Sequence, residues 1–458
     1  MPDYLFVTGK LAAPALAATL EAMKPAFSHM TAVLGASVAA LMDAGWISRH
    51  LPDAGGCRTV MIPGPCRGDL RLIEDRLGVP VVRGPNDLKD LPVHFGGRRD
   101  KTGYGAFRVR ILAEIHDAHS LDLEAILARA RYFRDSGADC IDLGGPPSGG
   151  LPQVETLVTA LRAEGFAVSL DCFDPETIVR ADRAGVDLVL SVNSDNLEVA
   201  RGLRAKVVVI PDFGEGLASL EKNAARLAGW GIDPILDPIL DPIGFGLSES
   251  LWRFREVRRR HPEAPMLMGL GNVTELTEAD STGVTAVLAG VMAELRIDYA
   301  LTTEVASFAR GAVRELDLAR RIMHYAIETH SLPKGIDDAL LTVKDPYHAV
   351  YSTAELLEIK ERIRDQNYRI FVGNGRITVL NRDIFVQGTD PRELFPKLSV
   401  LDPGHAFYLG RELERAQLAV MLGKKYTQES PLRFGYLSPV REEPPQPSEP
   451  PKEPNVCA

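Results

Sequence analysis

The chain of 458 residues has few cysteines, no long apolar run and no basic stripe, and each shortage excludes a class of protein. Its five cysteines form no Cys-x-x-Cys pair and their number is odd, which argues against a disulfide framework and a structural zinc site. No run of about 18 apolar residues occurs, so we expect no membrane span. A net charge of −10 and the lack of a basic stripe argue against nucleic-acid binding. MPDYLFVTGK shows no recognisable signal peptide, and the acidic balance suits a cytoplasmic enzyme without indicating its substrate.

What the sequence does contain is a short apolar run followed by an amphipathic stretch, repeated eight times between Arg108 and His330. Each run is short and continuous, as expected for a strand that is buried on both faces. Eight such units in about 220 residues predict a (β/α)8 TIM barrel, with a doubly wound sheet as the structural alternative. The predicted strands are Val109–Ile115, Ala138–Leu143, Phe166–Leu170, Asp187–Val192, Ala205–Ile210, Asp233–Leu240, Pro265–Leu270 and Asp298–Thr303.

The regions outside the barrel follow from the same patterns. The first alternates strands and helices, which indicates a small α/β (Rossmann-like) domain with a parallel sheet. The region after the barrel predicts a small α+β domain with a hairpin turn at Asn374-Gly375. The last residues are too polar and proline-rich to build a core and should be disordered. The predicted divisions are 1–105 for the N-terminal domain, 106–332 for the barrel, 345–438 for the C-terminal domain and 439–458 for the tail.

Three details of the N-terminal region add expectations. Its strand-end loops at Thr8–Lys10 and Pro63–Gly68 suit either a ligand or scaffolding. They match neither the phosphate-binding P-loop nor the dinucleotide Gly-x-Gly-x-x-Gly pattern. Residues 37–51 predict one amphipathic helix. The basic, glycine-flanked stretch at 98–101 predicts a solvated linker into the barrel.

Acid and amide side chains follow most of the predicted barrel strands. In a TIM barrel the reactive residues lie on loops at the carboxyl ends of the strands, so these side chains should converge on one rim. A single Asp at such a position is more often the N-cap of the next helix. Several strands contributing acids or amides to one rim favour a ligand site instead. The residues are Glu114, His116, Asp142, Asp171, Asn193, Asp212, Asp237, Asp241, Asn272 and Glu304.

Several of these strand ends resemble the pterin-binding domain that dihydropteroate synthases share with pterin-dependent methyltransferases. DLGGPP, which begins at Asp142, is similar to the family's second-strand turn. SLDCFD and the downstream SVN are similar to its third and fourth strand ends, at Asp171 and Asn193. ILDPIGFG resembles the sixth-strand LDPGIGFG element and leaves both Asp237 and Asp241 as candidates. The resemblance covers the barrel region and implies a dihydropteroate-synthase-like barrel that binds a pterin.

These residue types are chemically suited to a pterin. A pterin presents a 2-amino group beside a ring N–H, and one buried carboxylate can accept hydrogen bonds from both. An asparagine amide offers one donor and one acceptor to the neighbouring ring atoms. Phe213 or Phe245 could stack against the ring, and the alternative is that either is a core residue. The predicted pterin-binding residues are Asp171, Asn193, Asp212, Asp237, Asp241 and Asn272.

The chain departs from the synthases at two strand ends. The lysine of their strand-7 SRKSF element is replaced in GLGNVTEL, where Asn272 resembles the asparagine of the methyltransferase GLSNVS element. Their strand-8 Arg-x-His pair is missing from TTEVASFAR, which offers Arg310 as the nearby cation. These departures argue against ordinary folate synthesis. The whole arrangement resembles the dihydropteroate-synthase-related proteins of methanogens and methylotrophs that are tied to tetrahydromethanopterin.

The resemblance implies a transferase that joins a 6-hydroxymethyl-dihydropterin diphosphate to an arylamine, which would be a ribofuranosyl-aminobenzene phosphate. Mg²⁺ would accompany the substrate diphosphate, no resident metal site is expected, and two copies of the chain could pair. The expected catalytic residues are Asp142 near the reacting carbon, His116, and Arg310 as an anion-binding group. Glu114 and His116 have a structural alternative, pairing with Asp142. The alternative functions are a pterin-dependent methyltransferase with a corrinoid partner and a non-catalytic pterin-binding protein.

Overall fold

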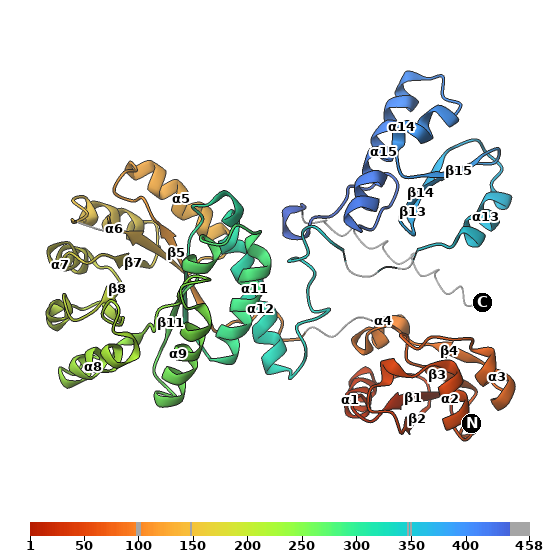
Figure 1. The fold of residues 1–458 in the computed structure, drawn as a ribbon, viewed down its shortest axis with the longest axis horizontal. Coiled ribbons are helices and arrows are strands. Elements are labelled where there is room, and N and C mark those ends of the chain that lie inside the picture. The colour runs from red at the N-terminus through yellow and green to blue at the C-terminus, as the bar shows by residue number, and fades with distance from the viewer. Residues whose placement is uncertain (98–101, 147–148, 346–347, 349, 440–458) are drawn as a thin grey trace, which may run out of the picture. The chain divides into compact units, whose positions relative to one another are not determined.

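The computed structural model describes residues 1–97, 102–146, 149–345, 348 and 350–439. Its contacts divide the chain into two compact units, Met1–Tyr104 with Lys334–Ile336, and Gly105–Pro333 with Asp337–Ala458 (Figure 1). The predicted linker at 98–101, the tip of the second strand loop at 147–148 and the predicted tail beyond residue 439 lie outside the described residues. The domain boundaries given above remain predictions.

The N-terminal unit is a four-stranded parallel sheet with helices on both faces, in the strand order β2-β1-β3-β4. Alternate residues of a strand point to opposite faces. Leu5 and Val7 of β1 therefore pack in one apolar cluster with α2 and α3, and Phe6 packs in another with α1 and α4. The elements are β1 (Tyr4–Gly9), α1 (Ala13–Met23), β2 (His29–Leu34), η1 (Ala39–Leu41), α2 (Ala44–His50), β3 (Thr59–Ile62), α3 (Arg71–Leu77), β4 (Val81–Arg83), η2 (Leu88–Asp90) and α4 (Leu91–His94).

The prediction of one helix over residues 37–51 is wrong. This segment forms the 3₁₀ turn η1 and then the separate helix α2. Asp43 between them has an extended backbone, and its side chain accepts a hydrogen bond from the backbone N–H of Trp46 at 2.7 Å. An aspartate in this N-cap role starts a new helix. The apolar periodicity continues on both sides of Asp43 and does not mark the break.

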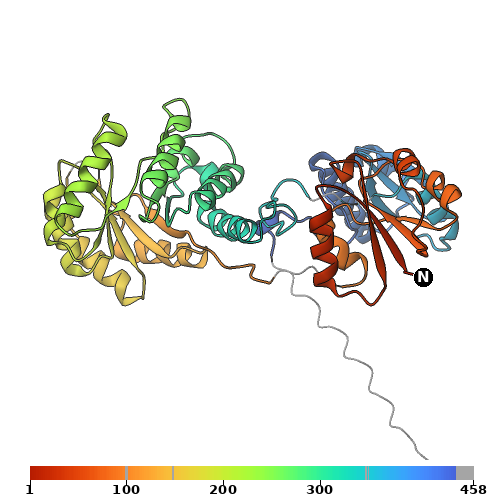
Figure 2. The ribbon, with the colours of Figure 1, turned by 90° about the horizontal axis from the view of Figure 1, so that it is seen from below.

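The larger unit contains the predicted eight-stranded parallel barrel. The strands follow the order β10-β9-β8-β7-β6-β5-β12-β11, and a parallel bridge between Leu236 and Met266 joins the two ends of this order. The helices lie outside the strands (Figure 2). The strands are β5 (Arg110–Ile115), β6 (Cys140–Gly144), β7 (Val168–Asp171), β8 (Leu188–Val192), β9 (Lys206–Val209), β10 (Ile235–Leu236), β11 (Leu267–Gly269) and β12 (Tyr299–Thr302). The helices are α5 (Leu123–Asp135), α6 (Val154–Ala163), α7 (Pro175–Ala184), η3 (Leu197–Gly202), α8 (Gly216–Gly229), α9 (Leu247–Arg260), α10 (Gly271–Thr274), α11 (Ser281–Glu294), η4 (Ser307–Ala309) and α12 (Ala312–Glu328).

The barrel has two apolar clusters, one inside the ring of strands and one between the strands and the helices. On β5, Ile111 and Ala113 pack in the cluster between strands and helices, whereas Leu112 packs in the interior cluster. Because side chains alternate along a strand, Glu114 also points inward. The interior cluster ends below Glu114, so the inward positions nearest the carboxyl end carry polar side chains. The interior cluster contains Leu112, Cys140, Leu188, Leu190, Val208, Ile235, Leu267 and Tyr299.

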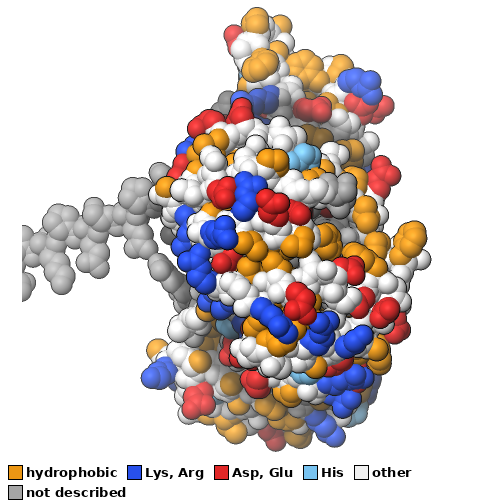
Figure 3. Space-filling view, turned by 90° about the vertical axis from the view of Figure 1, so that its left-hand side faces the viewer, with side chains coloured by type: hydrophobic (Ala, Val, Ile, Leu, Met, Phe, Trp, Pro, Cys, Tyr) orange, Lys and Arg blue, Asp and Glu red, His pale blue; other side chains and the backbone are white. Residues whose placement is uncertain are grey.

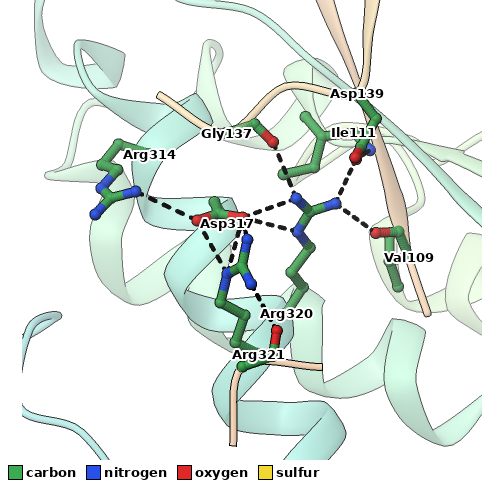
Figure 4. A network of polar contacts seen from close by, with 9 residues as sticks. Val109, Ile111, Gly137, Asp139, Arg314, Asp317, Arg320 and Arg321 are labelled. Atoms are coloured by element: carbon green, nitrogen blue, oxygen red, sulfur yellow. Dashed lines mark hydrogen bonds and ion pairs between the residues drawn. The ribbon is translucent and has the colours of Figure 1, made fainter. Parts of the chain in front are cut away.

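At the opposite, amino end, a buried arginine ties α12 to the barrel (Figure 4). The side chain of Arg320 is 2% exposed and donates to Asp317 at 2.7 Å. It also donates to the backbone carbonyls of Val109 and Gly137 at 2.7 and 2.9 Å, and it pairs with Asp139. Carboxylates and carbonyls therefore surround this cation, as burial of a charge requires.

Aspartates just before three strands also cap neighbouring strands at the amino end. Each side chain accepts a hydrogen bond from a backbone N–H at or just before the start of the adjacent strand. This bond satisfies a backbone donor at the end of the sheet. These bonds help to hold neighbouring strands together. The pairs are Asp139 with Ile111 at 2.8 Å, Asp187 with Val168 at 2.9 Å and Asp298 with Met266 at 3.1 Å.

Charged side chains of both signs mix on the face that Figure 3 shows. Exposed ion pairs of this kind contribute about 0–1 kcal/mol each. They cover the barrel's helices without deciding its stability. Within the described residues, no helix is long and apolar enough to cross a membrane. Pairs on this helical layer include Arg131–Glu164, Arg162–Asp187, Arg180–Glu155 and Arg226–Glu198.

The C-terminal part of the larger unit contains an antiparallel sheet in the order β13-β14-β15, against which α15 packs. The predicted hairpin at Asn374-Gly375 is confirmed, and both residues have positive φ, 53° and 71°, as a tight hairpin turn requires. The elements are α13 (Thr353–Arg362), β13 (Arg369–Gly373), β14 (Arg376–Leu380), β15 (Phe385–Gly388), α14 (Pro391–Leu394), η5 (Phe395–Lys397), α15 (Pro403–Leu422) and η6 (Gly435–Leu437).

Candidate functional site

A cavity of about 590 Å³ lies at the carboxyl ends of the barrel strands. Its residues come from β5, β7, β8, β9, β10, β11 and β12 or from the segments that follow them, so opposite sides of the barrel contribute. Much of the wall is aliphatic, including Leu190, Val208, Leu240, Leu267 and Leu301. The charged and amide groups on it are Glu114, His116, Asp171, Asp237, Asn272 and Glu275.

Two aspartates face this cavity from different strands. Asp171 ends β7 and Asp237 follows β10. Burial raises the pKa of both carboxyl groups. For Asp237 the pKa reaches about 7, because burial and the charge of Asp171 outweigh the N–H of Ile239, which donates to its carboxylate at 2.8 Å. A ligand that offers N–H donors would favour the charged form of these groups.

The backbone that holds Asp237 is strained. Ile239 has φ of 62°, a conformation that a β-branched residue rarely adopts. Ser191, on the same cavity, has φ of 59° and lies where the pairing of β8 with β9 shifts register. Such residues cost about 1–3 kcal/mol each and cluster at functional sites. Here the strain places the Ile239 N–H on the carboxylate of Asp237.

The short helix α10 and its C-cap bring an amide and a third carboxylate to the cavity. The Nδ2 of Asn272 donates to the carbonyl of Leu240 at 2.8 Å, which leaves Oδ1 as the acceptor of this side chain. Glu275 accepts from the backbone N–H groups of Val305 and Ala306 at 3.1 and 2.5 Å. Glu275 therefore fixes the loop after β12 as well as lining the cavity.

Glu114 and His116 form a pair on the β5 side. The ring Nδ1 lies 3.2 Å from the Glu114 Oε1. The side chain of Glu114 is 17% exposed and that of His116 is 61% exposed. Burial raises the pKa of Glu114, and the hydrogen bond from His116 opposes that rise. The pair thus links a buried carboxyl group to an exposed ring, an arrangement that can move a proton between the cavity and solvent.

Asp142 lies in the barrel interior and does not line the cavity. It is fully buried, and Ser169 donates to its Oδ1 at 2.6 Å. Among the residues that the structure describes, none forms a hydrogen bond with its Oδ2. Burial, together with the charges of Asp171 and Glu114, raises the pKa of Asp142 well above its usual value. The charged form of this carboxyl group is therefore disfavoured in the folded chain.

Comparison with known proteins places the chain in a family. The uncharacterized protein MJ0107 of Methanocaldococcus jannaschii is 30% identical over 365 residues, which are 70% of this chain and 69% of that protein. The chain belongs to the family of MJ0107. Two family models match outside the barrel, a family of unknown function (DUF6513) over residues 2–86 and PterinBD-DUF4346 over residues 366–429.

Solved structures similar to the chain include dihydropteroate synthases. A Yersinia pestis DHPS with a pterine-sulfa conjugate is 20% identical, with a TM-score of 0.39, and the match covers 48% of this chain and 94% of that one. A Coxiella burnetii dihydropteroate synthase in complex with pteroic acid is 17% identical, with a TM-score of 0.40, and the match covers 49% and 95% of the two chains.

Three predicted pterin-binding residues, Asn193, Asp212 and Asp241, do not line the cavity. Asn193 is 1% exposed, and its Oδ1 accepts from the backbone N–H of Asp195 at 3.1 Å. The Asp212 Oδ1 accepts from the backbone N–H of Ser194 at 2.9 Å and from Asn223 Nδ2 at 2.8 Å. Burial alone would raise the pKa of Asp212, but these hydrogen bonds outweigh it and lower the pKa. Both side chains hold loops in this family member.

The acid Asp241, the cation Arg310 and two phenylalanines are also absent from the cavity wall. Asp241 forms an ion pair with Arg253 at 2.7 Å and does not line the cavity, so Asp237 is the acid of the LDPILDP repeat that faces it. Arg310 is exposed and does not line the cavity either. Phe213 and Phe245 are 76% and 83% exposed, and neither is on the wall. Neither ring is therefore on the cavity wall or in the core.

Sequence reasoning missed Glu275 and the strained residues Ser191 and Ile239. Glu275 stands three residues after Asn272, which puts both on one side of a single helical turn. That spacing was available in GLGNVTEL. The strain at Ser191 and Ile239 had no sequence signal, because serine and isoleucine are ordinary strand-end residues.

Proposed function

We propose that the barrel is a pterin-binding transferase of the dihydropteroate synthase type. The observation that carries the proposal is the placement of Asp171, Asp237 and the amide of Asn272 on one buried cavity. A pterin presents adjacent N–H donors to a carboxylate and ring acceptors beside them. A cavity of about 590 Å³ has room for a bicyclic ring and an attached group, within the usual range for small-molecule sites. Aliphatic side chains would cover the faces of the ring.

The reaction we propose joins a 6-hydroxymethyl-dihydropterin diphosphate to an arylamine. The bond from the pterin methylene carbon to the diphosphate oxygen breaks, and the diphosphate leaves with the electron pair. The lone pair of the aniline nitrogen forms the new bond to the resulting methylene cation, and the nitrogen then releases one proton. Asp171, Asp237 and Glu275 would favour development of the cation by their negative charge. His116 would take the aniline proton, with Glu114 stabilising the protonated ring.

The leaving diphosphate needs positive charge that the cavity wall does not supply. Among the described residues that line it, there is no lysine or arginine. Within the described part of the chain, no three His, Cys, Asp or Glu side chains gather into a set that could hold a metal ion. We therefore propose that Mg²⁺ enters bound to the substrate diphosphate and water, and neutralises charge on the leaving group there.

The finer parts of the proposal follow the sequence resemblance. The arylamine would be a ribofuranosyl-aminobenzene phosphate, and the pathway would be tetrahydromethanopterin biosynthesis in the cytoplasm. The replacement of the synthase strand-7 lysine by the GLGNVTEL segment supports a substrate other than that of ordinary folate synthesis. A homodimer remains a prediction.

Pyrophosphate release tests the proposal. Purified protein is mixed with the dihydropterin diphosphate, Mg²⁺ and either 4-aminobenzoate or the ribosylated aminobenzene phosphate. We expect release that requires the ribosylated amine, loss of release in Asp237→Asn, and retained release in Asp241→Asn. Release with 4-aminobenzoate alone would contradict the proposed arylamine. An absence of release with either amine would contradict the synthase reaction.

A second candidate is methyl transfer from a methylated pterin to a corrinoid carried by a partner. Asn272 on the cavity and the lack of lysine or arginine among the described lining residues favour it, because this reaction releases no diphosphate. Its test is methylation of cob(I)alamin by a methylated tetrahydropterin in the presence of the protein. Methyl transfer without pyrophosphate release would establish this function. Pterin binding without either reaction would indicate a non-catalytic pterin-binding protein.

A further inference from the structure

We propose that the N-terminal unit holds a second small-molecule site, which takes an uncharged bicyclic heteroaromatic ring, free or as a nucleoside. The site is a cavity of about 350 Å³ between the carboxyl ends of β1 and β3. This inference goes beyond the proposed transferase function and does not depend on it. It assigns a ligand to a unit whose sequence family is described as one of unknown function.

The cavity occupies the switch point of the sheet. In the order β2-β1-β3-β4, the chain leaves β1 toward β2 and later returns to the other side of β1 as β3. The helix that follows β1 packs on one face, where Leu16 contacts the cluster of Phe6, and the helix that precedes β3 packs on the other, where Ile47 joins Leu5. In open α/β sheets ligands bind in the crevice outside the strand ends at this point.

Close backbone contacts fix the loops around the cavity. A Cβ at Gly9 would come within 2.8 Å of the carbonyl oxygen of Ala36. A Cβ at Gly64 would come within 2.5 Å of the backbone of Pro85. Both glycines therefore allow neighbouring strand-end loops to touch. The cavity is preformed by these contacts, which lowers the entropy lost when a ligand binds.

The lining residues define the chemistry of the ligand. No charged side chain is among the described residues that line the cavity, and the side chains that can hydrogen-bond are those of Thr8 and Asn86. Pro63, Pro65 and Pro85 add rigid apolar walls and have no N–H to offer an anion. A phosphate or carboxylate would be buried there without a positively charged side chain beside it, which is costly. A neutral ring with a few hydrogen-bonding atoms on its edge fits this wall.

The mouth of the cavity leaves large apolar side chains in contact with solvent. Leu11 is 73% exposed and Val38 is 43% exposed, and both line the cavity. A flat ring seated between them would remove this apolar surface from water. The volume of about 350 Å³ lies at the lower end of small-molecule sites, which suits a bicyclic base or its nucleoside.

The barrel cavity and this one differ in chemistry. The first has carboxylates on its wall, whereas the second has no charged lining side chain among the described residues. The barrel cavity should therefore prefer a cationic or donor-rich ligand, and the N-terminal cavity should prefer a neutral apolar ring. This difference permits a test on the full chain.

The test is ligand-observed NMR on the full-length protein with adenosine, guanosine and 6-hydroxymethylpterin as probes. AMP serves as the charged counterpart of adenosine. We expect saturation transfer to at least one neutral probe, and binding of AMP about a hundredfold weaker than that of adenosine if adenosine binds. Each titration is repeated with Asp237→Asn, and binding in the N-terminal cavity is recognised by its persistence in that variant.

Val38→Trp fills the mouth, and Leu41→Trp is its matched control. Leu41 is 82% exposed in the same 3₁₀ turn and does not line the cavity. We expect affinity to fall about tenfold or more in Val38→Trp and to stay within about twofold in Leu41→Trp. Thr8→Val, which keeps the shape and removes the hydroxyl, should weaken a nucleoside about tenfold. The proposal is overturned if no neutral probe binds, if AMP binds as well as adenosine, or if both cavity variants bind as wild type does.

Discussion

The two ends of the barrel use the same residue type in opposite ways. At the amino end, Asp139, Asp187 and Asp298 accept backbone hydrogen bonds, and Asp317 binds the buried Arg320. At the carboxyl end, Asp171 and Asp237 face a cavity whose described lining residues include no lysine or arginine. Burial raises the pKa of both.

This difference separates stability from binding within one fold. A paired carboxylate with satisfied hydrogen bonds stabilises the folded chain, whereas a buried carboxyl without a cation destabilises its charged form. The carboxyl-end acids therefore reduce stability at neutral pH and are available to a ligand. The sites of barrels lie at that end, where loops can change without disturbing the closed sheet.

The largest expected effect is at the amino end. Arg320→Met should lower the free energy of unfolding by about 3–5 kcal/mol, because the buried Asp317 carboxylate, Asp139 and two backbone carbonyls would lose the donor that they share. Urea unfolding followed by circular dichroism measures this. Arg314→Met is the matched control, since Arg314 is 43% exposed and pairs with the same Asp317 at 3.3 Å. Its expected loss is under about 1 kcal/mol. Equal losses in the two variants would contradict the importance of the buried cation.

At the carboxyl end, removing an acidic charge should raise the free energy of unfolding instead of lowering it. Asp237→Asn should raise the free energy of unfolding at pH 8 by about 2–4 kcal/mol, since it removes a buried charge whose pKa is about 7. Asp241→Asn, four residues later, should instead lower it, because the ion pair with Arg253 is lost. The same unfolding measurement applies to both. A lower free energy of unfolding in Asp237→Asn would contradict this prediction, because it would mean that the charged Asp237 stabilises the folded chain.

The stability difference between wild type and Asp237→Asn should depend on pH. Unfolded Asp237 releases its proton near pH 3.8, and folded Asp237 releases it near 7, so between these values the folded state holds more protons. The contribution of this group to stability therefore falls as the pH rises from about 4 to 7 and is flat above 7. Unfolding of wild type and Asp237→Asn at pH 4, 5, 6, 7 and 8 should give a gap that widens up to pH 7. A constant gap would be inconsistent with the raised pKa.

The smallest expected effect concerns an amide. Asn272→Ala should weaken binding of 6-hydroxymethylpterin about tenfold, because one hydrogen-bonding group of the cavity is lost. Asn193→Ala should lower the thermal midpoint and leave the affinity within about twofold, because the Asn193 side chain accepts from a loop N–H outside the cavity. Pterin fluorescence and thermal unfolding separate the two results. An affinity loss in Asn193→Ala equal to that in Asn272→Ala would place Asn193 in the site after all.

The sequence predicted the barrel because each strand carries its own local signal, a short continuous apolar run that ends in polar residues or glycine. It predicted the convergence of Asp171 and Asp237 on one end for the same reason. It did not distinguish Asp237 from Asp241, because both stand in an identical Leu-Asp-Pro-Ile context. The distinction comes from Arg253, twelve residues beyond Asp241 on α9, which pairs with Asp241.

Sequence also could not show that Asn193 and Asp212 lie off the cavity wall. Both follow a strand, as a site residue would, yet each caps a nearby loop through bonds to Asp195, Ser194 and Asn223. A short polar side chain after a strand can bind a ligand or its own loop, and the choice depends on the path of that loop. Residue type and spacing are alike in both cases, so sequence could not tell them apart.

Titration calorimetry of 6-hydroxymethyl-dihydropterin into the full chain at pH 8, where Asp237 is ionised, tests the central claim most directly. The account predicts binding to wild type, loss of about a hundredfold or more in affinity in Asp171→Asn, and affinity within about twofold of wild type in Asp212→Asn. Equal affinity in wild type and Asp171→Asn, or loss confined to Asp212→Asn, would contradict the assignment of the carboxyl-end cavity as a pterin site.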